Sequence, residues 1–251
     1  MKTITGITKK SKNYEVFFNG ELLVVEPEVF LKYRLSPGKE LELKTYNEFV
    51  KENEYTFFYK LGIIKLKRML TRKEIKDFLI TKGASEPIVK QVVQKYIERK
   101  YVDDFVYAKD YIAQKKYSDG PLVIEHKLRE KGIDPAVIED LLRQNDETEI
   151  LLELMPKKMR SMSKKSKKQA LQTVKGFFIR KGFHMEAVDT ALKNALEFYT
   201  GNELSLIEKD YQKLVRRYQT KPDHQNMQYE IIQKLYAKGY KMEDIKKVVK
   251  S

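Results

Sequence analysis

The sequence contains no cysteine and no tryptophan, and only three of its 251 residues are histidine. Without cysteine there is no disulfide, no thiolate nucleophile and no cysteine-liganded metal site. His126, His184 and His224 are not at the i, i+4 spacing of a helical metal site, so we expect no metal. No stretch approaches the roughly 18 apolar residues of a membrane span. Residues 1–12 are too polar for a secretory signal, so we expect a cytoplasmic protein without a membrane partner.

Short motifs of nucleotide-binding and hydrolytic enzymes are also missing. The chain has no Gly-x-x-x-x-Gly-Lys loop, no Gly-x-Gly-x-x-Gly turn and no Gly-x-Ser-x-Gly elbow. One carboxylate pair, Asp103-Asp104, could suggest acid–base chemistry. Adjacent helical residues point about 100° apart, however, so the two carboxylates do not converge on one atom. An N-cap at Asp103 explains the pair better, and we expect neither enzyme activity nor a cofactor.

A segment that occurs four times is the most informative feature that the sequence does have. Each copy is an apolar-patterned helix that ends in Lys-Gly and is followed by a second amphipathic helix, and successive glycines lie 49, 50 and 57 positions apart. Apolar residues recur four and eight positions before each glycine and one, six and ten positions after it. Such a period predicts one supersecondary unit stacked several times, with an extended interaction surface rather than a catalytic cleft.

The residues at the ends of these helices have structural explanations. The repeat glycines suit the left-handed residue that follows a helix, and the lysine before each one faces the negative end of the helix dipole. Thr71 and Glu74 form the pattern of a capping box, and Ser85 and Asp134 stand where N-caps are needed. The four repeat glycines are Gly83, Gly132, Gly182 and Gly239.

The first 50 or so residues follow a different pattern. Residues 14–18 and 21–25 read as strands joined by an Asn19-Gly20 type I′ turn. Pro27 can open a short helix to residue 33, residues 40–43 alternate like an edge strand, and the helical signal begins at about Glu54. Additional helices are expected over residues 103–117, 148–162 and 204–218. The predicted parts are a β-hairpin-containing unit, 1–53, and four helical repeats, 54–100, 101–145, 146–200 and 201–251.

Positive charge is concentrated in the repeats. The net charge is +14, yet residues 1–55 hold nine basic and nine acidic side chains. Seven cations and no carboxylate fall between Lys157 and Lys168. Such a field attracts polyanions such as DNA or an acidic protein surface, although a lysine-rich composition and a solvated helix end remain alternatives. The candidate contacts are Lys65, Lys67, Arg68, Arg72, Lys115, Lys116, Lys157, Lys158, Arg160, Lys164, Lys165, Lys167, Lys168, Arg216 and Arg217.

Several short patterns follow one another along the chain, and no single one of them is specific. They are Thr71-x-x-Glu74-Ile75-x-x-x-Leu79, Tyr101-Val102-Asp103-Asp104-x-x-x-Ala108-x-x-Tyr111, Gly120-Pro121, Ile124-x-x-x-Leu128-x-x-Lys131-Gly132-Ile133 and Phe178-x-x-Lys181-Gly182-Phe183. Their order and spacing together resemble the RecX family of bacterial recombination regulators. The leading hairpin and fourth repeat are similar to the longer form found in low-GC Gram-positive bacteria. Thr71 stands where a serine is usual and preserves the cap.

The resemblance implies a mainly α protein, an extended curved array of four three-helix repeats preceded by a small β-rich N-terminal unit. It implies binding along a RecA recombinase filament, with inhibition or modulation of recombination, ATP hydrolysis and cleavage of the SOS repressor. DNA, single- or double-stranded and without sequence preference, is a second expected partner, and we expect a monomer. The alternative is a nucleic-acid-binding helical protein that acts on DNA or RNA without a filament.

Overall fold

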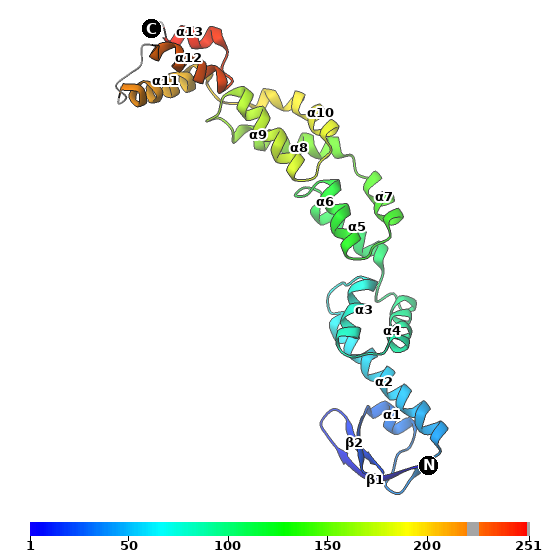
Figure 1. Ribbon diagram of the computed structural model, residues 1–251. Helices are drawn as coiled ribbons and strands as arrows, with labels where there is room; N and C mark the ends of the chain where they lie inside the picture. The colour runs from blue at the N-terminus through cyan, green and yellow to red at the C-terminus, as the bar shows by residue number, and fades with distance from the viewer. Residues whose placement is uncertain (220–225, 250–251) are drawn as a thin grey trace. The chain divides into compact units, whose positions relative to one another are not determined.

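The computed structural model describes residues 1–219 and 226–249 (Figure 1). They form two compact units, one of residues 1–108 with 130–133 and the other of residues 109–129 with 134 onward. The described residues are mainly helical, with one small sheet near the N-terminus, so the predicted mainly α class with a β-rich beginning is confirmed.

The N-terminal sheet has four antiparallel strands in the order β3-β2-β1-β4. The predicted hairpin is present, and both turn residues have the positive φ of a type I′ turn, 49° at Asn19 and 88° at Gly20. The sequence reading missed the first strand. A short helix, α1, follows the hairpin and begins at Pro27, as predicted. The elements are β1 Lys2–Lys9, β2 Tyr14–Phe18, β3 Glu21–Val25, α1 Pro27–Lys32 and β4 Glu40–Leu41.

Helix α2, Leu43–Lys65, begins well before the expected start at Glu54, and β4 is shorter than the expected strand. The prediction was wrong because Leu41 and Leu43 alternate like a strand, whereas only residues 40–41 pair with β1. Phe49 on α2 is buried in the core of the sheet, and Phe58 on the same helix is buried in the core of the first repeat. One continuous helix therefore crosses the predicted boundary at residue 53.

Each repeat consists of three helices. The first helices of the second, third and fourth repeats occupy the predicted slots to within one or two residues at most boundaries. The helices are α2, α3 Arg72–Thr81 and α4 Glu86–Glu98 in the first repeat, α5 Asp104–Lys115, α6 Pro121–Glu130 and α7 Pro135–Arg143 in the second, α8 Glu147–Arg160, α9 Lys167–Arg180 and α10 Met185–Ala195 in the third, and α11 Glu203–Gln219, α12 Met227–Ala237 and α13 Met242–Val249 in the fourth.

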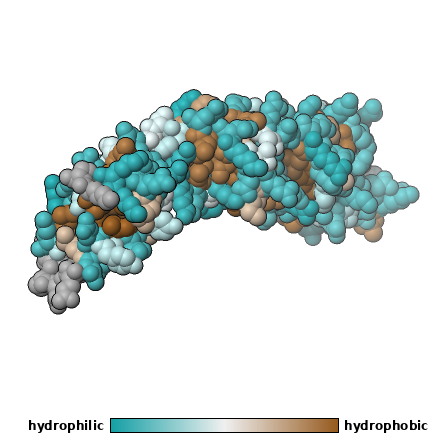
Figure 2. All heavy atoms as spheres, turned by 90° about the horizontal axis from the view of Figure 1, so that it is seen from above, coloured by the Kyte–Doolittle hydropathy of each residue, from teal (hydrophilic) through white to brown (hydrophobic). Residues whose placement is uncertain are grey.

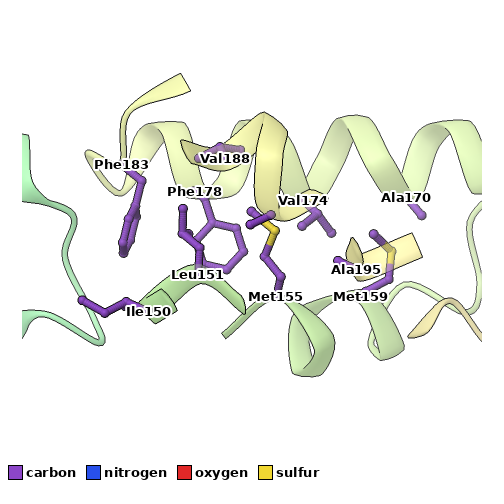
Figure 3. Packing of buried hydrophobic residues seen from close by; sticks show 11 residues of the cluster. Ile150, Leu151, Met155, Met159, Ala170, Val174, Phe178, Phe183, Val188 and Ala195 are labelled. Carbon is purple, nitrogen blue, oxygen red and sulfur yellow. The ribbon is translucent and has the colours of Figure 1, made fainter. Parts of the chain in front are cut away.

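The apolar positions of the repeat form the cores. Residues four and eight positions before each glycine are at most 3% exposed in all four repeats, and those six positions after it are at most 2% exposed. The third repeat shows the arrangement (Figure 3): Phe183 and Ile150 lie at one end, Phe178, Leu151 and Met155 fill the middle, and Met159, Ala170 and Ala195 close the other end. Burial of each large side chain stabilises the fold by about 1.5–3 kcal/mol.

Candidate interaction surfaces

The Lys-Gly turns close their helices as the sequence predicts. Gly83, Gly132, Gly182 and Gly239 have φ of 91°, 78°, 88° and 85°. After α3, the Gly83 N–H donates to the Ile80 carbonyl at 2.9 Å and the Ala84 N–H to the Leu79 carbonyl at 3.1 Å. These two bonds define a Schellman motif, which satisfies carbonyls at the helix end.

The turn of the second repeat also binds the first repeat. Thr71 caps α3 by accepting the Glu74 N–H at 3.2 Å, and its hydroxyl donates to the Lys131 carbonyl at 2.7 Å. The Lys73 ammonium donates to the Glu130 carbonyl at 2.8 Å, and Lys131 pairs with Glu74 at 2.6 Å. A threonine expected only to cap its own helix therefore joins two repeats, and no local sequence pattern indicates the second bond.

Equivalent contacts recur further along the chain. The Gly120 N–H donates to the Lys181 carbonyl at 2.7 Å, and the Ser166 hydroxyl donates to the Lys238 carbonyl at 2.5 Å. Gly120 is necessary because a Cβ there would lie 2.3 Å from the carbonyl carbon of Gly182. The start of the second helix in each of the first three repeats thus hydrogen-bonds to the Lys-Gly turn of the next repeat.

Acidic residues at the start of the first helix in the second and fourth repeats complete two of these contacts. Asp103 caps α5, whereas Asp104 accepts the Arg72 N–H at 2.8 Å, a role that the sequence reading missed. Burial raises the pKa of Asp104, against the opposing effect of Arg72. Glu203 accepts the Lys167 N–H at 2.7 Å in the same way.

The middle contact differs because proline lacks an N–H. Pro121 occupies the position in the second repeat that is equivalent to Arg72 in the first and Lys167 in the third. It has no N–H to donate, so no carboxylate is needed there as an acceptor. Glu147, at the start of α8, instead binds the His184 N–H at 2.6 Å and the His184 Nδ1 at 2.8 Å. Ser85, the counterpart of His184, contacts Glu54 through its hydroxyl and makes no cap bond.

The basic run from Lys157 to Lys168 spans the end of α8, the loop after it and the start of α9. None of its seven cations forms an ion pair with a residue in the described part of the chain. Lys158 lies over the Phe177 ring at 4.0 Å and Arg160 over the Phe198 ring at 5.1 Å, while Lys165 donates to Thr173 at 3.0 Å. The remaining exposed ammonium groups belong to Lys157, Lys164, Lys167 and Lys168.

A cavity of about 390 Å³ adjoins the basic run. Its lining combines aromatic rings of the second and third repeats with lysines of the third repeat, and Lys181 lies 3.8 Å from the Asp119 carboxylate. The aromatic residues are Tyr117, Phe177, Phe178 and Phe183, and the lysines are Lys157, Lys158 and Lys181. Figure 2 shows one face of the protein, where hydrophilic residues predominate and apolar side chains emerge in separate patches.

The other candidate cations are scattered over several elements. Lys65 ends α2 with its ammonium 5.0 Å from the Phe78 ring centre, and Lys67 and Arg68 are exposed in the loop that follows. Arg72 lies 3.7 Å from Asp104. Lys115 ends α5, and Lys116 donates to Asn145 at 3.4 Å. Arg216 and Arg217 are exposed near the end of α11.

Two kinds of feature are absent from the part of the chain that the structure describes, a metal site and a membrane-spanning helix. No three histidine, aspartate or glutamate side chains within residues 1–219 and 226–249 gather as a metal site would require. His224 lies outside these residues. Over the same ranges, no helix combines the length and apolar character needed to cross a membrane.

The fold defines a class of protein, a helical-repeat protein with a small N-terminal sheet. Comparisons with known proteins then identify the family. The model of the second three-helix domain of RecX matches residues 103–142. A regulatory protein RecX of Geobacillus sp. (strain WCH70) is 31% identical, with 98% of this chain and 95% of that protein aligned, and one of Streptococcus mutans is 28% identical over 98% of both.

A solved structure of a RecX protein is also similar to this chain, in both fold and sequence. The crystal structure of RecX from Lactobacillus salivarius covers 57% of this chain and 97% of its own, with a TM-score of 0.54 and 25% identity. The chain belongs to the RecX family of regulatory proteins. The resemblance seen in its motifs is confirmed.

Proposed function

We propose that this chain binds a RecA-type recombinase filament on DNA and restrains its recombination, ATPase and co-protease activities. It acts by binding as a monomer in the cytoplasm and carries out no reaction of its own. The similarity to regulatory RecX proteins supports the proposal, because the alignments with them extend over 98% of this chain.

The single observation that carries the binding part is the unpaired basic run. Seven neighbouring cations repel one another, and an anionic partner that neutralised them would gain free energy by doing so. No carboxylate within the described residues does this. A polyanionic filament of nucleic acid and protein supplies the missing charge.

The test replaces those lysines that the fold does not use. Lys157, Lys164 and Lys167 make no side-chain contact with another described residue among the hydrogen bonds, ion pairs and ring contacts, so changing them to glutamine preserves the fold. Lys158, Lys165 and Lys168 are left intact because they pack or bond within the chain. We expect the triple variant to co-sediment with recombinase-coated DNA about tenfold more weakly, the loss of about 1.4 kcal/mol.

A control makes the same charge change elsewhere. Lys44, Lys51 and Lys12 are exposed and lie in the neutral N-terminal part of the chain. Their replacement by glutamine should leave filament binding unchanged. An equal loss of filament binding in both triple variants would show that only net charge matters. Unchanged filament binding in both variants would show that the basic run is a solvated surface without a binding role.

A second candidate function is binding to bare nucleic acid without a recombinase. The aromatic lining of the cavity beside Lys157 favours it, because nucleobases stack on aromatic rings with about 1–3 kcal/mol per base. Phe177→Leu would then weaken binding to single-stranded DNA severalfold, whereas filament binding through protein contacts would survive.

A further inference from the structure

Two positions of the repeat face each other across the groove between its second and third helices. They lie seven residues before and seven residues after the repeat glycine. In the third repeat they hold Lys175 and Asp189, whose Nζ and Oδ1 atoms are 2.5 Å apart. The geometry of the repeat therefore brings these two side chains into direct contact.

The second repeat holds two glutamates at these positions, and each is neutralised on its own helix. Glu125 pairs with Arg129 at 2.5 Å on α6, and Glu139 pairs with Arg143 on α7. Both arginines lie four residues after their glutamates, the favourable spacing on a helix. The charges at these two positions are therefore neutralised within the chain.

The first repeat holds two lysines there, Lys76 on α3 and Lys90 on α4. Both are exposed, and neither forms an ion pair with any residue that the structure describes. They line a groove of about 360 Å³ together with Arg72 and Lys73, against a single acidic residue, Glu86. Like charges at facing positions are unfavourable unless an anion from outside lies between them.

The floor of this groove is aliphatic. It is lined by Val89, which is 2% exposed, and by the partly buried Val93 and Ile97. Branched aliphatic side chains pack against other aliphatic groups but give no flat surface for stacking a base. The cavity beside Lys157 has the opposite character, with aromatic rings. The two basic hollows therefore suit different partners.

We propose that the α3–α4 groove binds an acidic segment of the recombinase that carries aliphatic side chains. Its carboxylates lie between Lys76 and Lys90, and its aliphatic side chains pack on Val89, Val93 and Ile97. This inference rests on the proposed function and assigns one protein-binding site within it.

The first experiment supplies the missing carboxylate from within the chain. Lys90→Asp gives the first repeat the same arrangement as Lys175 and Asp189 in the third. The new carboxylate would pair with Lys76 inside the groove, and the fold would be preserved. We expect its affinity for recombinase-coated single-stranded DNA to fall about tenfold, the loss of a charge-assisted contact. Affinity for bare single-stranded DNA should stay within about twofold, since the groove does not hold phosphates.

Lys44→Asp is the matched control. Lys44 is exposed on α2 outside the groove, and the substitution makes the same change in net charge. Unchanged filament binding by Lys90→Asp would overturn the inference, as would an equal loss for both substitutions. A loss on bare DNA equal to that on the filament would assign the groove to phosphates instead. A wild-type chain that fails to bind the filament would overturn the proposed function itself, which is a different result.

A second experiment identifies the occupant directly. Gln94 is exposed and lines the groove, so the photoreactive substitution Gln94→benzoylphenylalanine places a crosslinker there in the full chain. Irradiation with the filament should give an adduct to a recombinase peptide that contains acidic and aliphatic residues, identified by mass spectrometry. An adduct to DNA alone, or to a recombinase peptide without acidic residues, would overturn the assignment.

Discussion

At the scale of single residues, the distance between packed side chains determines which helical glycines tolerate a larger residue. Gly62 on α2 lies against Tyr96 of α4, and a Cβ at Gly62 would be 2.3 Å from the Tyr96 hydroxyl oxygen. That hydroxyl donates to the Tyr59 carbonyl at 2.5 Å and cannot move freely. Gly176 on α9 has only the flexible end of Arg180 nearby, at 3.2 Å.

The two glycines should therefore respond oppositely to alanine. Gly62→Ala should destabilise the fold by about 1–3 kcal/mol through overpacking. Gly176→Ala should stabilise it by up to about 1 kcal/mol, because alanine favours helix. Urea unfolding measures both, and Tyr96→Phe should partly rescue Gly62→Ala by removing the obstructing hydroxyl. A neutral Gly62→Ala would contradict the close packing of α2 and α4.

The Glu74–Lys131 pair predicts a dependence of stability on pH. Burial alone would raise the pKa of Glu74, but the Lys131 ammonium and the Thr71 N–H outweigh it and hold the pKa below the ordinary 4.5. The hydrogen bond to Glu74 raises the pKa of Lys131 above the ordinary 10.5, although burial opposes it. The carboxylate therefore stabilises the fold above its ordinary pKa, and the ammonium below its own.

Glu74→Gln isolates this charge, because a glutamine oxygen can still accept the Thr71 N–H. The variant should be less stable than the wild type at pH 7. That difference should shrink as the pH falls through the lowered pKa of Glu74, since the wild-type carboxylate is then protonated. It should also shrink as the pH rises through the raised pKa of Lys131. Urea unfolding across this range checks the prediction, and a constant difference would show that the pair contributes no pH-dependent stability.

At the scale of elements, the helix cap that bonds to the next repeat should cost more to remove than an ordinary cap. Ser166 accepts the Gln169 N–H and donates to the Lys238 carbonyl, whereas Asp134 bonds only within its own helix start. Loss of a cap costs about 1 kcal/mol. The Lys238 carbonyl, which lies in a partly buried contact, would in addition lose its hydrogen bond, worth about 0.5–1.5 kcal/mol.

We therefore expect Ser166→Ala to destabilise the chain clearly more than Asp134→Ala. Urea unfolding gives both values, and amide exchange should show the added loss at the helices around Lys238. Equal costs for the two substitutions would mean that the bond to Lys238 contributes nothing.

The sequence predicted local elements well where their signals were local. The Asn19-Gly20 turn, the Thr71 capping box and the Lys-Gly turns depend on adjacent residues, and all are present. Strand β1 was missed because only Ile4 along it is fully buried, so its sequence shows little alternation. The early part of α2 was missed partly because buried Asn53 is polar. Its side chain bonds to the Glu26 N–H and the Val24 carbonyl, contacts that no periodicity of apolar residues reveals.

The sequence indicates where positive charges cluster, but it does not indicate which cations are paired with a carboxylate in the fold. The basic run is visible as a cluster of neighbouring residues in the sequence. Lys76 and Lys90, by contrast, are separated by 14 positions and line the same groove only because a turn folds α4 back beside α3. The use of Asp104 by Arg72 is equally non-local. The proposed role of the basic run stays a prediction until binding is measured.

At the scale of the whole molecule, the repeats differ in the surfaces that they offer to a partner. The first repeat offers an aliphatic, basic groove and the third an aromatic, basic cavity, while the Lys-Gly turns of the later repeats are occupied by bonds to their neighbours. Gly83 is the exception, with no atom near its missing Cβ. Such a division suits a regulator that recognises protein and nucleic acid together.

Regulation of a filament and binding to bare nucleic acid are distinguished by comparing two dissociation constants at matched salt. Fluorescence anisotropy of a labelled single strand would give the affinity of the full chain for the strand alone and for the strand coated with recombinase and nucleotide. We expect binding to the coated strand to be at least about tenfold tighter, the difference that about 1.4 kcal/mol of protein contact supplies. Equal affinities, or tighter binding to the bare strand, would contradict a filament regulator and favour a nucleic-acid-binding protein.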